Sequence, residues 1–166
     1  MSKVNPIPEG YYSVTPYLCL SDAAAALDFY QKAFGATELF RFNGPDGKIA
    51  HAEMKIGNSI LMLSGEYPEM GFRSPLTLGG CPIGLMLYVE DVDAFAEKAV
   101  AAGAVLDKPI ENKFYGDRSG ALKDPFGYSW FVSTHIEDVS PEELQKRMAA
   151  MPECGGAQTG ELSATN

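Results

Sequence analysis

One alternating stretch occurs twice in this sequence, and it limits the possible folds more than any other feature. In residues 13–20, aliphatic side chains and a proline alternate with hydroxyl, phenol and thiol groups. Residues 83–89 repeat such an alternation, about 70 positions later. A two-residue period is typical of a β-strand with two different faces, one packed under a helix and the other lining a surface. The sequence therefore predicts a protein built around two copies of one strand.

Other landmarks repeat at nearly the same interval. A helix-capping aspartate, a helix-ending glycine and a hairpin glycine each occur twice, as Asp22 and Asp91, Gly35 and Gly103, and Gly57 and Gly127. Each half of the chain then predicts the order β-α-β-β-β. We therefore expect an α+β fold with two tandem modules, at about residues 12–65 and 83–136, within one domain at residues 12–139. Residues 66–82 are rich in Gly and Pro and are expected to be the linker.

The end of the chain contains an explicit helix start. Residues 140–143 form a capping box with proline at the first helical position. They predict a C-terminal helix at residues 140–151, packed through Leu144 and Met148. Residues 152–166 are predicted to be a disordered tail, because few of them can anchor to a core.

Composition and charge exclude several classes of protein. The formal net charge of -9 argues against nucleic-acid binding, since phosphate contacts need a basic surface. No apolar run approaches the roughly 18 residues needed to cross a bilayer, and the first residues lack the apolar core of a signal peptide. Cys19, Cys81 and Cys154 are an odd number without metal-binding spacing. We therefore expect reduced thiols in a cytoplasmic protein with no membrane partner.

Five segments carry a family resemblance: DFYQKAFGA, HAEMKIGNSILML, YVEDVDAFAEKAVAAGA, GDRSGALKDPFGYSW and STHIEDVSPEEL. Together they resemble the vicinal-oxygen-chelate superfamily, which includes glyoxalase I, bleomycin-resistance proteins and extradiol dioxygenases, and within it the PhnB-like branch. The resemblance covers roughly residues 13–147. It implies that each module forms half of a curved sheet and that paired modules enclose a cup for metal and substrate. Several members pair modules between chains, and each sheet here has one face without a helix, so we expect a homodimer.

The resemblance also implies where a metal would bind. In metal-dependent members the ligands come from the first and last strands of each module, which correspond here to Thr15, Met62, Gly84 and Phe131. These positions hold no imidazole or carboxylate, the groups that such a site needs. We therefore expect no metal site there and no cofactor. Bleomycin-resistance-like members also lack the metal and only sequester a ligand, so fold alone leaves the function open.

Strand alternation predicts which side chains line the cup. They are Thr15, Tyr17, Cys19, Met62, Met86, Tyr88 and Phe131. As a set they suit an apolar or aromatic small molecule, although each one singly also fits an ordinary core. Cys19 has no neighbouring base, which is typical of an inert buried thiol. Arg118 either holds an anionic group at the mouth of the cup or forms a structural ion pair with an aspartate.

His51 and Glu53 lie two residues apart on one predicted strand, so both face the cup together with Lys55. One interpretation is an acid/base pair in a lyase, isomerase or dioxygenase, with or without a metal. The other is a half-solvated strand with polar cross-strand pairs. A metal at this site would need a third ligand, which only His135 or Glu137 offers. Small-molecule binding is therefore the first hypothesis, and catalysis by His51 and Glu53 is the alternative.

Overall fold

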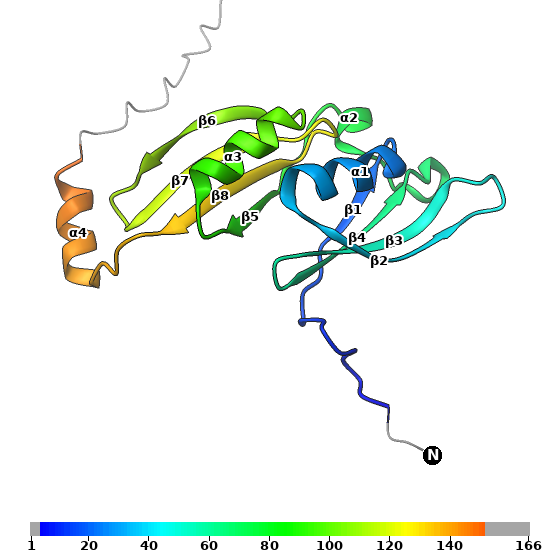
Figure 1. Cartoon of the computed structure of the whole chain (residues 1–166), viewed down its shortest axis with the longest axis horizontal. Coiled ribbons are helices and arrows are strands. Elements are labelled where there is room, and N and C mark those ends of the chain that lie inside the picture. Colours follow the sequence, from blue (N-terminus) through cyan, green and yellow to red (C-terminus); the bar gives the residue numbers. More distant parts are fainter. Residues whose placement is uncertain (1–3, 152–166) are drawn as a thin grey trace, which may run out of the picture.

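The protein, analysed as a computed structural model that describes residues 4–151, contains two four-stranded sheets (Figure 1). The strand order is β1-β4-β3-β2 in the N-terminal sheet and β5-β8-β7-β6 in the C-terminal sheet. In each sheet the first strand pairs in parallel with the last, and the other pairs are antiparallel. The predicted pair of tandem β-α-β-β-β modules is confirmed.

The elements of both modules follow the expected order along the chain. The N-terminal module contains β1 (Tyr17–Leu20), α1 (Ala23–Phe34), β2 (Thr37–Asn43), β3 (Ile49–Ile56) and β4 (Ser59–Gly65). The C-terminal module contains β5 (Gly84–Tyr88), α3 (Val92–Ala101), β6 (Val105–Asn112), β7 (Asp117–Lys123) and β8 (Ser129–His135). Within the linker lie the short 3-10 helix η1 (Pro68–Met70) and α2 (Pro75–Leu78), and α4 (Pro141–Ala149) follows β8.

Each module uses its long helix to cover one face of its sheet. Asp22 caps α1 by accepting the Ala25 N–H at 2.9 Å, and Gly35 ends it in the left-handed conformation at φ 66°. Asp91 caps α3 in the same way, by accepting the Ala94 N–H at 3.0 Å. Within residues 4–151, no helix covers the opposite face of either sheet (Figure 1). We call this the open face.

An aromatic cluster joins the two modules. The Phe34 ring of α1 stacks on Phe95 of α3 with centroids 5.4 Å apart, and it meets Trp130 of β8 at 4.8 Å. Asp124, in the turn between β7 and β8, accepts hydrogen bonds from the Tyr30 hydroxyl at 2.7 Å and from Trp130 Nε1 at 2.9 Å. The modules therefore share one core, and the contacts between α1 and α3 hold them together.

The first strand and the linker differ from the expectation. β1 begins at Tyr17 instead of residue 13, and Val14 is 83% exposed. Pro16 has no amide hydrogen to donate to a ladder, which limits pairing at this end. The linker is also more ordered than its composition indicates, because Ser74 accepts the Thr77 N–H and starts the single turn of α2.

The C-terminal helix forms where predicted, and of its two expected packing residues only Leu144 is partly buried. Met148 is 57% exposed, and α4 contains no buried residue. Its anchor is Arg147, which forms hydrogen bonds with Glu137 at 2.6 and 2.8 Å and with the Phe114 carbonyl at 3.2 Å. The predicted disordered tail at 152–166, including Cys154, lies outside the described residues. Among residues 4–151 we find no helix of the length and apolarity that a membrane span requires.

Candidate functional site

The open face of the N-terminal sheet carries the histidine and glutamate singled out from the sequence. Tyr17 on β1 reaches across β4, and its phenol oxygen lies 2.8 Å from Nδ1 of His51 on β3. The Nε2 atom of His51 lies 3.2 Å from Oε1 of Glu53. Tyr11, from the segment before β1, also bonds to Glu53. The sequence predicted the His51–Glu53 pair but neither of these phenol contacts.

The hydrogen-bond partners determine where the protons lie on a neutral His51. An ionised carboxylate only accepts, so Nε2 carries the proton toward Glu53 and Nδ1 accepts from the Tyr17 hydroxyl. The bond to Glu53, helped by partial burial and by the charge of that carboxylate, raises the pKa of Tyr11 to about 12. The Tyr11 phenol therefore stays protonated and donates to Glu53. His51 is held in one tautomer by groups on both sides.

Aromatic rings surround His51 on this face. The rings of Phe42 and Phe40 lie with their centroids 5.9 and 6.4 Å from the imidazole, and both side chains are about half exposed. The Tyr17 ring contacts His51 at 5.5 Å and Phe72 of the linker at 5.7 Å. Exposed rings beside a hydrogen-bonding group are suited to a flat apolar ligand that carries one polar atom.

The open face of the C-terminal sheet has an apolar part. Met86 on β5 and Phe131 on β8 are neighbours in register, and both are partly exposed. The Nζ atom of Lys108 lies 5.9 Å from the centroid of the Phe131 ring. A side chain at Gly84 would overlap the Phe131 ring, so the glycine allows that ring to lie over the strand.

A second polar network begins two residues further along β5. Tyr88 donates to Oδ2 of Asp117 on β7 at 2.9 Å, and because β8 lies between these strands the phenol crosses over it. Asp117 is only 4% exposed, and its Oδ1 accepts from Nδ1 of His135 at 2.9 Å. Nε2 of His135 lies 3.0 Å from Asp138. The hydrogen bonds to Asp138 and Asp117 raise the pKa of His135.

The four positions expected to match the family's metal site lie in two pairs. Met62 donates its N–H to the carbonyl of Pro16, next to Thr15, and Gly84 lies against Phe131. None of the four supplies an imidazole or carboxylate. Across residues 4–151, no group of three or more His, Cys, Asp or Glu side chains is arranged to hold a metal ion.

Arg118 and Cys19 are two other predicted lining residues. Arg118 lies on the helix side of β7, where its guanidinium pairs with both carboxylate oxygens of Asp93 on α3 at 2.6 Å. Of the two interpretations of Arg118, this geometry corresponds to the ion pair with an aspartate, and Asp117 occupies the open face of β7. Cys19 is buried at 4% exposure, and burial, followed by the charge of Glu66, raises the pKa of its thiol to about 11.

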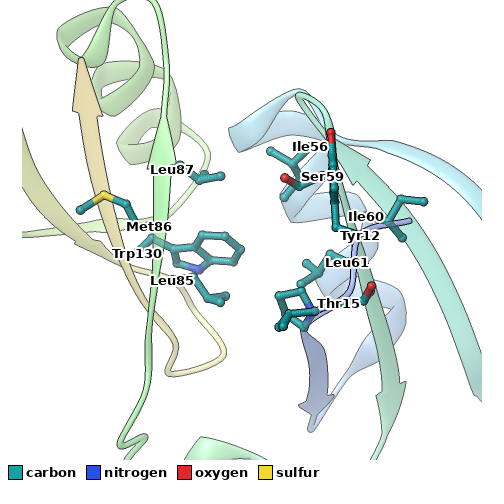
Figure 2. A pocket seen from close by; sticks show the side chains of 12 residues that line it. Tyr12, Thr15, Ile56, Ser59, Ile60, Leu61, Leu85, Met86, Leu87 and Trp130 are labelled. Carbon is teal, nitrogen blue, oxygen red and sulfur yellow. The ribbon is translucent and has the colours of Figure 1, made fainter. Parts of the chain in front are cut away.

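A small cavity of about 220 Å³ lies between the modules (Figure 2). Leu85, Leu87 and Trp130 face it from the C-terminal module, while Met86 points away toward the open face. Ile56, Ser59, Ile60 and Leu61 line the other side, together with Tyr12 and Thr15 from the segment before β1. Thr15 thus lines this intermodule cavity, which is continuous with the shared apolar core.

Sequence reasoning missed several residues of these two networks. They are Tyr11, Phe40, Phe42, Asp117 and Asp138. Phe40 and Phe42 alternate like the lining residues of the first strand, and that signal alone would have placed them on one face. The bond between Tyr11 and Glu53 has no local signal, because 42 residues separate the two partners.

Comparison with known proteins identifies the family. Residues 13–132 match the Glyoxalase/Bleomycin resistance protein/Dioxygenase superfamily. The chain belongs to this superfamily. An uncharacterized protein of Mycobacterium bovis is 42% identical over 141 residues, which are 83% of this chain and 93% of that protein. The family expected from the sequence is confirmed.

Solved structures of other proteins share this fold. TioX from Micromonospora sp. ML1 is 27% identical, with a TM-score of 0.59 over 75% of this chain and 99% of TioX. A PhnB protein from Bacillus cereus, described as a putative 3-demethylubiquinone-9 3-methyltransferase, has a TM-score of 0.58 over 74% of this chain and 99% of its own. Its identity of 18% makes it similar in fold alone. In this superfamily member, the His51 and His135 networks lie on the open faces of the two sheets.

Proposed function

We propose that this superfamily member binds an apolar, aromatic small molecule on the open face of its N-terminal module. The supporting observation is that the half-exposed rings of Phe40 and Phe42 flank His51, whose two nitrogens are held by Tyr17 and Glu53. The rings supply apolar contact area, and the oriented imidazole and phenol supply hydrogen bonds to one polar atom of the ligand. No part of this binding mode uses a metal.

The neutral compound 2-naphthol is a direct probe of this site. We expect measurable binding by titration calorimetry, and Phe42→Ala should weaken it about tenfold, because a lost ring contact is worth roughly 1.4 kcal/mol. Val100→Ala, at an exposed apolar position on α3, is the matched control and should change nothing. Treatment with a chelator should leave the affinity unchanged. Equal affinity in Phe42→Ala, or loss of binding after chelation, would contradict the proposal.

A second candidate function is acid/base catalysis at the same place. The observation that favours it is the continuous hydrogen-bonded series Tyr11, Glu53, His51 and Tyr17, since a general base needs a partner that orients it. Incubation of the bound compounds with wild type and with His51→Gln, followed by mass spectrometry, separates the two functions. Conversion by wild type that is lost in the variant supports catalysis, whereas unchanged compound in both supports binding alone.

We also propose that the open faces pair in a homodimer, with the ligand held between them. Tyr17, Phe42, Met86 and Phe131 are partly exposed on these faces, more apolar surface than isolated side chains account for. Light scattering at micromolar concentration should give twice the mass of one chain. Phe131→Glu should give the single-chain mass, while Val100→Glu should remain dimeric. A single-chain mass for wild type would refute the dimer.

A further inference from the structure

We infer that a groove beside the C-terminal module is a second ligand site, which binds the carboxylate of an apolar small molecule at His135. This site goes beyond the proposed function, because it shares no residue with the His51 network. It lies between β5, α3 and the turn that joins β3 to β4, and it has a volume of about 1190 Å³. Phe34, Phe95 and Met86 contribute apolar walls, and Tyr88 and His135 also line it.

Both ring nitrogens of His135 face carboxylates. Nδ1 faces the buried carboxylate of Asp117 at 2.9 Å, and Nε2 faces that of Asp138 at 3.0 Å. Both acceptors are carboxylates, so both ring nitrogens donate when His135 is protonated, and the two carboxylates favour that form. His51 differs, because one of its nitrogens accepts from a phenol. The two open faces therefore offer different chemistry, an imidazole bonded to a phenol and a carboxylate in one module and an imidazole between two carboxylates in the other.

The two carboxylates beside His135 differ in burial. Asp117 is almost fully buried and is also held by Tyr88, so it is a permanent part of the structure. The Asp138 side chain is fully exposed, and an exposed pair of this kind contributes little free energy. The Asp138 carboxylate thus occupies the place of an anion at Nε2 of His135, and its bond to that nitrogen is weak. A ligand carboxylate with an apolar body can replace it and gain the contacts of the groove.

Other polar groups line the same groove as His135. Lys98 of α3 lines the groove and forms no ion pair with any residue in 4–151, so it adds a second cation. Glu90 and Asp91 also line it, but Asp91 is engaged in capping α3 and Glu90 is exposed. Ser133, two residues before His135 on β8, has a fully buried hydroxyl without a hydrogen-bond partner among the described residues.

The anionic probe 2-naphthoate tests the inference in the full-length protein. We expect His135→Gln to weaken its binding about tenfold, by removing one charge-assisted hydrogen bond. At about pH 5.5, where an imidazole is mostly protonated even without a carboxylate partner, Asp138→Asn should tighten binding severalfold, because it removes the competing carboxylate, and a misfolded variant cannot produce that gain. The affinity should be greatest near about pH 6 and should fall as the pH rises through the raised pKa of His135, because only the imidazolium binds the anion.

His51→Gln and the neutral amide 2-naphthamide separate this site from the proposed function. The His51 variant should bind 2-naphthoate as wild type does, and the amide should show no dependence on His135. Unchanged 2-naphthoate affinity in both His135→Gln and Asp138→Asn would overturn the inference. Loss of 2-naphthoate binding in His51→Gln alone would assign the anion to the N-terminal module instead and would also overturn it. Failure of 2-naphthol binding, with these results intact, would affect only the proposed function.

Discussion

Replacing Asp124 with alanine will destabilise the protein by about 4 kcal/mol. This aspartate is 5% exposed and accepts four hydrogen bonds, from the amides of Phe126 and Tyr128, the Tyr30 hydroxyl and the Trp130 indole, all between 2.7 and 2.9 Å. Burial and the Asp124 charge raise the pKa of Tyr30 well above its usual value, so the phenol remains a donor. Alanine leaves these buried donors without an acceptor, and each such group costs roughly 1–3 kcal/mol.

Urea unfolding followed by circular dichroism measures this effect, and Asp107→Ala is the matched control. Asp107 is exposed on β6, so its replacement should change the free energy of unfolding by less than about 0.5 kcal/mol. Asp124→Asn should lower the free energy of unfolding by an intermediate amount. It keeps the shape of the side chain but turns one acceptor into a donor that faces other donors, so it should still be clearly destabilising. An Asp124→Ala protein as stable as the Asp107 variant would show that the network contributes nothing.

Phe34→Ala is the second change with a large expected effect. The Phe34 ring is 6% exposed and lies in contact with Tyr30, Phe95 and Trp130, at centroid distances of 5.6, 5.4 and 4.8 Å. Its removal leaves a cavity where the two modules meet, and a buried Phe-to-Ala change typically costs about 4 kcal/mol. The same unfolding experiment measures the loss, because the modules share this core.

Phe42→Ala is the same substitution at an exposed position and serves as the comparison. The Phe42 ring is about half exposed on the open face of the N-terminal sheet, so the same truncation should cost less than about 1 kcal/mol in an isolated chain. If the two variants lose the same stability, then either the Phe34 cavity collapses fully or the open face is covered by another chain. Mass measurement on the Phe42 variant distinguishes these outcomes.

The sequence by itself determined the family, the two β-α-β-β-β modules and most element boundaries. The reason is that these features are local. Asp22 and Asp91 cap helices through residues three positions ahead, and strand alternation places His51 and Glu53 on one face. The capping box at 140–143 likewise predicted where α4 begins.

Only the tertiary structure decided which side chains meet across strands and modules. Tyr17 reaches His51 over β4, and Tyr88 reaches Asp117 over β8. These contacts depend on sheet order and register, and no local sequence pattern predicts them. The pairing of Arg118 with Asp93 depends on which face of β7 the arginine occupies and on a partner 25 residues away on α3, so the sequence left it open. The protonated form of His135 is likewise favoured by two carboxylates, one brought from a neighbouring strand and the other from the segment after β8.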